Sequence, residues 1–258
     1  METHTINGKE VEIYTSIDSL PAGRYHQFNR YLLIDSHIGG NIEAVSRHVD
    51  KIALLLKKGR TEEAALTLRN MQQTMAFIIQ NLDPGLLAFT PLIKSIDGVQ
   101  VEALTDEQAQ ALVAQLTTPA APVGFWRSLI ARIKKKIDDE LSLLYPKLSS
   151  GTSRRIFSEL KTMAYAYLQE ITTGEDKSAT IASVEDYLLD LNKPRIFWGP
   201  QGVEASFIRS FNLLCVTLGK YLNTDPRKVP VSQFMAAVFL IQEEKKALTP
   251  ITSKKRSR

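Results

Sequence analysis

Apolar residues recur at three- and four-residue spacing along most of this chain, a period that is typical of amphipathic helices. The clearest stripe consists of Ile42, Val45, Val49, Ile52 and Leu56. Patterns of this kind predict helices at residues 21–38, 42–58, 61–82, 105–116, 126–145, 156–173, 183–191, 207–222 and 234–241. The sequence therefore predicts a mainly α protein, because helices with one apolar face need partners that cover it.

Residues that start or stop helices stand at the edges of these stripes. Ser19 and Pro21 precede the first helix, and Gly39 with Gly40 follows it. Asn41 is the predicted N-cap of the second helix. Residues 105–108, Thr-Asp-Glu-Gln, have the composition of a capping box, which predicts a helix start at this point.

Two short segments alternate around a turn dipeptide instead of following the helical period. Asn7-Gly8 lies between β-prone residues 5–6 and 11–14, and Asp97-Gly98 lies within the apolar segment 93–101. Both dipeptides accept the positive φ angles of a tight hairpin turn. We therefore expect two minor β-hairpins beside the helices.

The domain organisation is predicted from the segment 117–124, which has no period and contains two prolines. It divides the chain into an N-terminal helical domain with small hairpins (1–116), a linker (117–124), a C-terminal helical domain (125–247) and a basic flexible tail (248–258). The predicted fold class is mainly α, with two helical bundles and minor β-hairpins. A single larger bundle with a proline-rich crossover is the alternative, because it would produce the same pattern.

Composition narrows the class of protein further. Of the 258 residues, 44% are hydrophobic and 23% are charged, which excludes disorder of the whole chain. The apolar runs are far shorter than the roughly 20 residues of a membrane-spanning helix, and the polar N-terminus does not resemble a secretory signal. We expect a protein that is made in a cytoplasm and makes no membrane contact.

Positive charge is concentrated at the C-terminus. Six basic residues, with no acidic residue among them, occupy this end of the chain: Lys245, Lys246, Lys254, Lys255, Arg256 and Arg258. Because the net charge of the whole chain is only +4, the rest of the chain is net negative. The tail residues Lys254, Lys255, Arg256 and Arg258 are candidate nucleic-acid contacts, although charged termini are commonly only solvated ends.

Known catalytic patterns are missing from the sequence. It contains no glycine-rich dinucleotide fingerprint, phosphate-binding loop or nucleophile elbow. Cys215 lies in an apolar segment, so we expect a core residue and not a nucleophile. His26, His37 and His48 lack the close spacing of zinc ligands, and adjacent acids such as Glu62-Glu63 fit solvated helix faces. We predict no catalytic residue, cofactor or metal site, and no enzymatic activity.

Aromatic residues next to glycines are the most unusual local feature. The segment 195–202, Arg-Ile-Phe-Trp-Gly-Pro-Gln-Gly, contains Arg195, Phe197 and Trp198, and Trp126 follows the predicted linker. Tryptophan and arginine are enriched in the binding hot spots of interfaces. These four residues are the candidate partner-binding residues, with the alternative that Phe197 and Trp198 plug the end of the second bundle.

Three stretches near the N-terminus, residues 13–21, 24–31 and 33–39, together resemble helical proteins encoded by tailed bacteriophages of Bacteroidetes hosts, including crAss-like phages. The segment 223–234, with an Asp-Pro turn before an apolar helix, is similar to the same group. The first resemblance covers about the initial 100 residues and the second about the last 35.

The resemblance implies a virion protein or an assembly factor that is made in the host cytoplasm and acts through protein surfaces. We expect a connector, tail or internal virion component that contacts other phage structural proteins and forms a homo-oligomer or ring. One alternative is a tail-assembly chaperone that is absent from the mature particle. Another is a nucleic-acid-binding protein that uses its basic tail, with affinity that falls steeply as salt rises.

Overall fold

The computed structural model describes residues 1–37, 42–80, 83–102, 104–117, 123–146 and 152–248. The protein is 69% helical with one small antiparallel sheet, so the prediction of a mainly α protein with minor β-hairpins is confirmed. The strands are β1 (Glu2–Ile6), β2 (Lys9–Ile13), β3 (Ile93–Ile96) and β4 (Val99–Gln100). The helices are α1 (Ala22–His37), α2 (Ile42–Lys57), α3 (Thr61–Gln80), α4 (Pro84–Leu87), the 3-10 turn η1 (Thr90–Leu92), α5 (Asp106–Leu116), α6 (Val123–Leu144), α8 (Thr152–Thr173), α9 (Ser178–Leu191), α10 (Val203–Leu218) and α11 (Val231–Leu248).

Both predicted hairpins are present, and they join into one sheet. Asn7 and Gly8 have φ angles of 52° and 74°, and Asp97 and Gly98 have φ angles of 48° and 77°. Two successive residues with positive φ make the turn that matches the right-handed twist of the flanking strands. The strand order is β1-β2-β3-β4, because β2 pairs with β3 although about 80 residues separate them.

Two helix starts follow the sequence signals, whereas the predicted start of the helix at 183–191 is wrong, because α9 already begins at Ser178 without a side-chain cap. Thr105 accepts a hydrogen bond from the backbone N–H of Gln108, and the Gln108 side chain accepts one from the backbone N–H of Thr105. The predicted capping box is therefore confirmed. Helix α3 begins at Thr61 as predicted, with Glu62 and Glu63 in its first turn. The predicted N-cap Asn41 lies outside the described residues.

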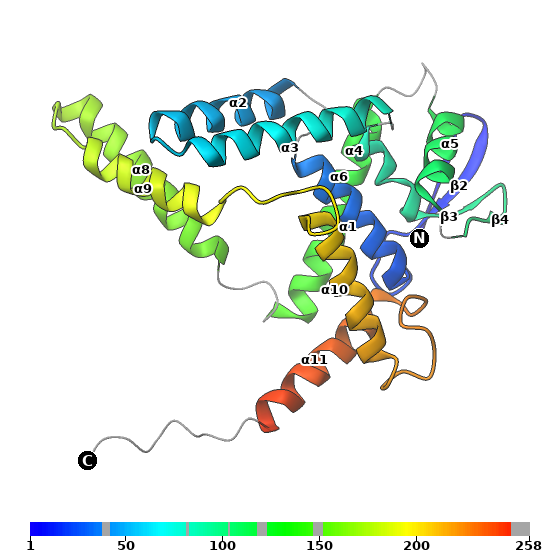
Figure 1. Ribbon diagram of the computed structural model, residues 1–258. Helices are drawn as coiled ribbons and strands as arrows, with labels where there is room; N and C mark the ends of the chain where they lie inside the picture. The colour runs from blue at the N-terminus through cyan, green and yellow to red at the C-terminus, as the bar shows by residue number, and fades with distance from the viewer. Residues whose placement is uncertain (38–41, 81–82, 103, 118–122, 147–151, 249–258) are drawn as a thin grey trace, which may run out of the picture.

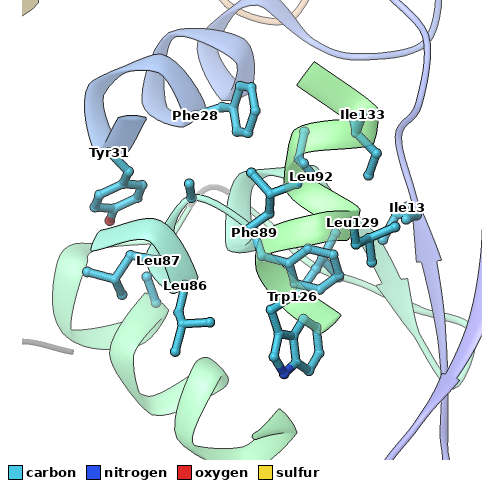
Figure 2. Packing of buried hydrophobic residues seen from close by; sticks show 14 of the residues in the cluster. Ile13, Phe28, Tyr31, Leu86, Leu87, Phe89, Leu92, Trp126, Leu129 and Ile133 are labelled. Atoms are coloured by element: carbon cyan, nitrogen blue, oxygen red, sulfur yellow. The ribbon is translucent and has the colours of Figure 1, made fainter. Parts of the chain in front are cut away.

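The main hydrophobic core lies where α1, α4, α5 and α6 meet the sheet (Figure 1). Figure 2 shows Trp126 and Leu129 of α6 beside Phe89 and Leu92, with Phe28 of α1 across the same cluster. The Trp126 ring meets the Phe89 ring edge to face at 4.8 Å between centroids. Aromatic pairs of this geometry are favourable beyond the area that they bury.

Residues from both sides of the predicted linker contribute to the main core. Residues 118–122 lie outside the described part of the chain, whereas Val123 and Gly124 are the first residues of α6. Five apolar residues of α6 belong to the cluster that the N-terminal elements build: Trp126, Leu129, Ile130, Ile133 and Ile137. Phe197 and Val231 belong to it as well. The division into two domains stays a prediction, and its two sides share this core.

Two smaller clusters attach the remaining helices. Ala22 at the start of α1 packs with Cys215 and Leu218 of α10 and with Phe234 and Ile241 of α11. Cys215 is therefore buried, as its apolar segment predicts. Leu189 of α9 packs against α2 and α3, which joins the α8–α9 pair of helices to the rest of the protein. In Figure 1 this pair lies on the side of the molecule opposite the sheet.

Candidate interaction surfaces

The loop before α10, which contains three of the predicted partner-binding residues, is held against α3. The Asn70 side chain donates a hydrogen bond from Nδ2 to the carbonyl oxygen of Arg195 (2.7 Å) and accepts one at Oδ1 from the backbone N–H of Phe197 (3.2 Å). Asn70 is itself buried. One amide side chain therefore satisfies two backbone groups of the loop, and these two hydrogen bonds fix the position of the loop against α3.

The aromatic side chains of this loop point toward α3 and the main core. Phe197 is only 3% exposed. Trp198 is half-buried, donates from Nε1 to Thr74 Oγ1 (3.0 Å) and stacks on Phe77 with 5.1 Å between ring centroids. The loop also passes close to the start of α10, since a Cβ at Gly202 would lie 2.3 Å from the Phe197 carbonyl oxygen. A glycine is required at this close approach.

The four predicted partner-binding residues therefore differ in access. Trp126 and Phe197 are buried in the main core, Trp198 is half-buried, and Arg195 is exposed. Trp126 and Phe197 pack inside this chain, and neither presents a surface for a partner. A partner-binding role of Arg195 and Trp198 stays a prediction. The candidate nucleic-acid residues Lys254, Lys255, Arg256 and Arg258 lie outside the described residues.

Sequence reasoning missed the largest exposed apolar feature, which lies on α8. Phe157, Leu168 and Ile171 are 70%, 55% and 81% exposed, and Leu160 is 39% exposed. The spacing of apolar residues in α8 predicts a helix with one apolar face. The apolar residues of α8 occupy more than the face that packs on α9. Counting apolar residues around the whole helix would have indicated a second face.

Other helices also expose large apolar side chains. Leu213 and Val216 project from α10, Leu240 projects from α11, and Leu143 lies near the end of α6. Isolated exposed apolar residues are normal on a protein surface, whereas several on one helix face indicate a contact site. The α8 face is the most extensive of these candidates, because it continues over most of the helix.

An ion-pair network fixes α1 against α5 and α10. The Arg30 guanidinium forms two parallel hydrogen bonds to the Asp106 carboxylate, at 2.8 and 2.9 Å, and donates from Nε to Glu204 Oε1 at 2.7 Å. The Tyr31 hydroxyl donates to the same Asp106 carboxylate at 2.7 Å. Burial alone raises the pKa of Asp106, but the hydrogen bonds from Arg30 and Tyr31 and the charge of Arg30 outweigh burial, so its pKa is lowered.

His26 lies at the contact of α1 with α10. Its ring stacks on Phe207 and Phe211, with centroid distances of 4.4 and 3.9 Å. Burial, together with the nearby charge of Arg30, lowers the pKa of His26 to about 4. The imidazole is therefore neutral at pH 7 and serves as a packing residue.

We expect the His26 ring to remain neutral at pH 5.5 and to titrate near pH 4 in an NMR titration. The unfolded chain takes up this proton near pH 6.5, so stability from this group is complete above pH 6.5 and decreases as the pH falls toward 4. A His26→Phe variant keeps the aromatic stacking and should lack this part of the pH dependence. Titration of the His26 ring near pH 6.5 would contradict the prediction.

Among the described residues, two hollows outside the main core have cations on their walls that are engaged within the chain. One, of about 710 Å³, lies between α1, the β3–β4 hairpin and α10. At its wall Arg24 donates to the Ile93 carbonyl oxygen (2.6 Å), and Arg227 donates to Asn212 Oδ1 (3.2 Å). The other, of about 900 Å³, lies between α2 and the α8–α9 pair, where Lys51 donates to the Asn192 carbonyl oxygen (2.9 Å). These cations support the chain itself.

Groups for metal or covalent chemistry do not converge in the part of the chain that the structure describes. There, no three or more His, Cys, Asp or Glu residues are grouped as metal ligands. Burial raises the pKa of the Cys215 thiol. Among the described helices, none is long and apolar enough to cross a membrane. The chain matches no protein-family model, and neither the curated proteins nor the solved structures contain a match to it.

Proposed function

We propose that this protein is a non-enzymatic bacteriophage structural or assembly protein that acts through protein–protein contacts. The observation that carries the proposal is the exposed apolar face of α8, where Phe157, Leu168 and Ile171 are more than half exposed. An apolar face of this length is costly in water and is stabilised when another protein covers it. The resemblance of the N-terminal segments to helical phage proteins supports the choice of a phage assembly as the setting.

Within a particle, the proposed place is the connector, the tail or the interior of the capsid. A helical protein with a rigid core and separate exposed helix faces suits a position between subunits, because each face can meet a different neighbour. Helix α8 lies on the side opposite the sheet, so a neighbour that covers α8 can leave the sheet side free for another (Figure 1). Other phage structural proteins and further copies of this chain are the proposed partners.

Quantitative mass spectrometry of purified particles tests the proposal. We expect the protein in the particle, at a copy number that follows particle symmetry if it forms a connector or tail ring, and at an irregular high number if it is internal cargo. The major capsid and portal proteins provide the internal standards. An abundant host cytoplasmic protein of similar mass controls for carry-over.

If the protein were absent from particles, its proposed role as a component of the mature virion would be contradicted. The alternative, an assembly chaperone made in the host cytoplasm, would then be favoured. The chaperone would then be found bound to a tail protein in lysates of infected cells before particles form. If the protein were absent from particles and bound no phage protein in those lysates, the structural and assembly roles would both be contradicted.

A further inference from the structure

Helix α8 has two separate apolar faces, and the described elements cover only one of them. The first face packs on α9, and Ala166, on this side, is buried. The second face consists of Phe157, Leu160, Ala164, Leu168 and Ile171, which we call the α8 stripe. At 100° per residue these five positions fall within about 80° of the helix circumference. All of them are exposed, so no other described element covers the stripe.

The α8 stripe is symmetric about Ala164. Successive members are three, four, four and three residues apart, so the spacing is the same in either direction along the helix. Two copies of α8 that lie antiparallel, with a two-fold axis at Ala164, place Phe157 opposite Ile171 and Leu160 opposite Leu168. The small Ala164 side chains then meet at the axis and allow the helices to approach closely.

From this symmetry we infer that two copies of the protein associate through an antiparallel pairing of their α8 helices. A two-fold interface uses the same patch on both subunits, and each patch must therefore be complementary to itself. The stripe satisfies this condition in size as well as spacing, because large residues at its ends face large residues and the small central residue faces itself. The inference rests on the proposed function and names one of its partners, a second copy.

Charge at the edge of the stripe is compatible with this pairing. Lys161 lies beside the stripe, with its ammonium 5.6 Å from the centre of the Tyr165 ring in the same helix. In the antiparallel pair the two Lys161 residues are offset by about 9 Å along the helix axis, at 1.5 Å per residue. The two like charges therefore do not face each other directly.

The available area reaches what a specific dimer needs. Tyr165 and Tyr167 flank the stripe on its two sides and are also exposed. With about 200 Å² for each fully exposed large side chain, the stripe and its flanking tyrosines offer about 600 Å² per copy. Complete burial of both patches removes at most about 1,200 Å² from water, which is the lower limit for specific interfaces. We therefore expect a weak and reversible dimer.

Sedimentation equilibrium of the full chain tests the association. We expect the wild-type protein to dimerise, and the double variant Leu168→Glu/Ile171→Glu to bind itself about 100-fold more weakly, because four carboxylates would enter the apolar contact. The matched control is Gln169→Glu, which adds a carboxylate at an exposed position of the same helix, outside the stripe. Circular dichroism confirms that each variant keeps its helix content. A wild-type protein that stays monomeric, or a control that dissociates equally, would overturn the inference.

Cysteine cross-linking tests the antiparallel geometry. A mixture of Phe157→Cys and Ile171→Cys proteins should form a disulfide-linked dimer, since these positions face each other. Phe157→Cys alone should not, because its two copies lie about 21 Å apart and a disulfide needs Cα atoms within about 7 Å. The native Cys215 is buried and remains in both proteins. Efficient cross-linking of Phe157→Cys to itself would indicate a parallel pair and contradict the inference.

These outcomes are separate from those for the proposed function. A monomeric protein that is nevertheless present in purified particles would refute the α8 pairing and leave the structural role intact. A dimer that is absent from particles and from phage protein complexes would support the pairing and refute the structural role.

Discussion

Replacing Trp126 with alanine is expected to lower the free energy of unfolding by about 3–5 kcal/mol. Trp126 is 2% exposed and contacts Phe89 in the core that α6 shares with the N-terminal elements. Its removal leaves a cavity at a place where several elements meet, so the surrounding structure cannot easily close it. The expected loss is the sum of two contributions: the transfer free energy of the buried indole and the cost of the cavity.

Urea unfolding followed by the fluorescence of Trp198, the tryptophan that remains, measures this effect. The control is Phe125→Ala, a neighbouring aromatic residue that is 43% exposed and should cost about 1 kcal/mol. Trp126→Phe should cost less than Trp126→Ala, because it keeps most of the volume and removes an indole N–H for which the described structure offers no acceptor. Equal losses for Trp126→Ala and Phe125→Ala would contradict the observed burial.

The Arg30→Leu variant is expected to lose about 2–3 kcal/mol of stability. Leucine removes the hydrogen bonds to Asp106 and Glu204 and leaves two carboxylates without their cation at the contact of α1, α5 and α10. Unfolding in urea at pH 7 measures the difference. Arg132→Leu is the control, because Arg132 forms an exposed pair with Glu2 and should contribute less than 1 kcal/mol.

Acid should reduce the difference in the free energy of unfolding between the wild type and the Arg30→Leu variant. The pKa of Asp106 is lower in the folded protein than in the unfolded chain, so its contribution is present above the unfolded value of 3.8 and is lost as the pH falls through the folded value. Arg30→Leu has already lost the pairing and should respond less to this change. A difference that stays constant from pH 7 to pH 2 would show that the Asp106 pair contributes no stability.

These predictions concern the rigid part of the molecule, which positions the exposed helices. Arg30 and the main core hold α1, α5, α6 and α10 together, and Leu189 joins the α8–α9 pair to α2 and α3. Ion pairs from Lys58 to Glu185 and Asp186 strengthen this second junction. The α8 stripe is therefore presented from a fixed base, which limits the entropy lost when a partner binds.

Local features of this protein were determined by the sequence itself. Asn7-Gly8 and Asp97-Gly98 specify their turns because positive φ angles suit these residues and few others. Thr105 and Gln108 specify a helix start because their side chains satisfy backbone groups only three residues away. Each feature depends on interactions between near neighbours, so a short stretch of sequence contains the whole cause.

Only the tertiary structure decided which surfaces meet. Three contacts join residues that are far apart in the sequence. They are the pairing of β2 with β3, the hydrogen bonds of Asn70 to the loop before α10, and the packing of Trp126 in the main core. The spacing of α8 predicts apolar faces, but exposure of the α8 stripe depends on where α9 packs. The sequence shows which positions of a helix are apolar, whereas the packing of the whole chain determines which neighbour covers them.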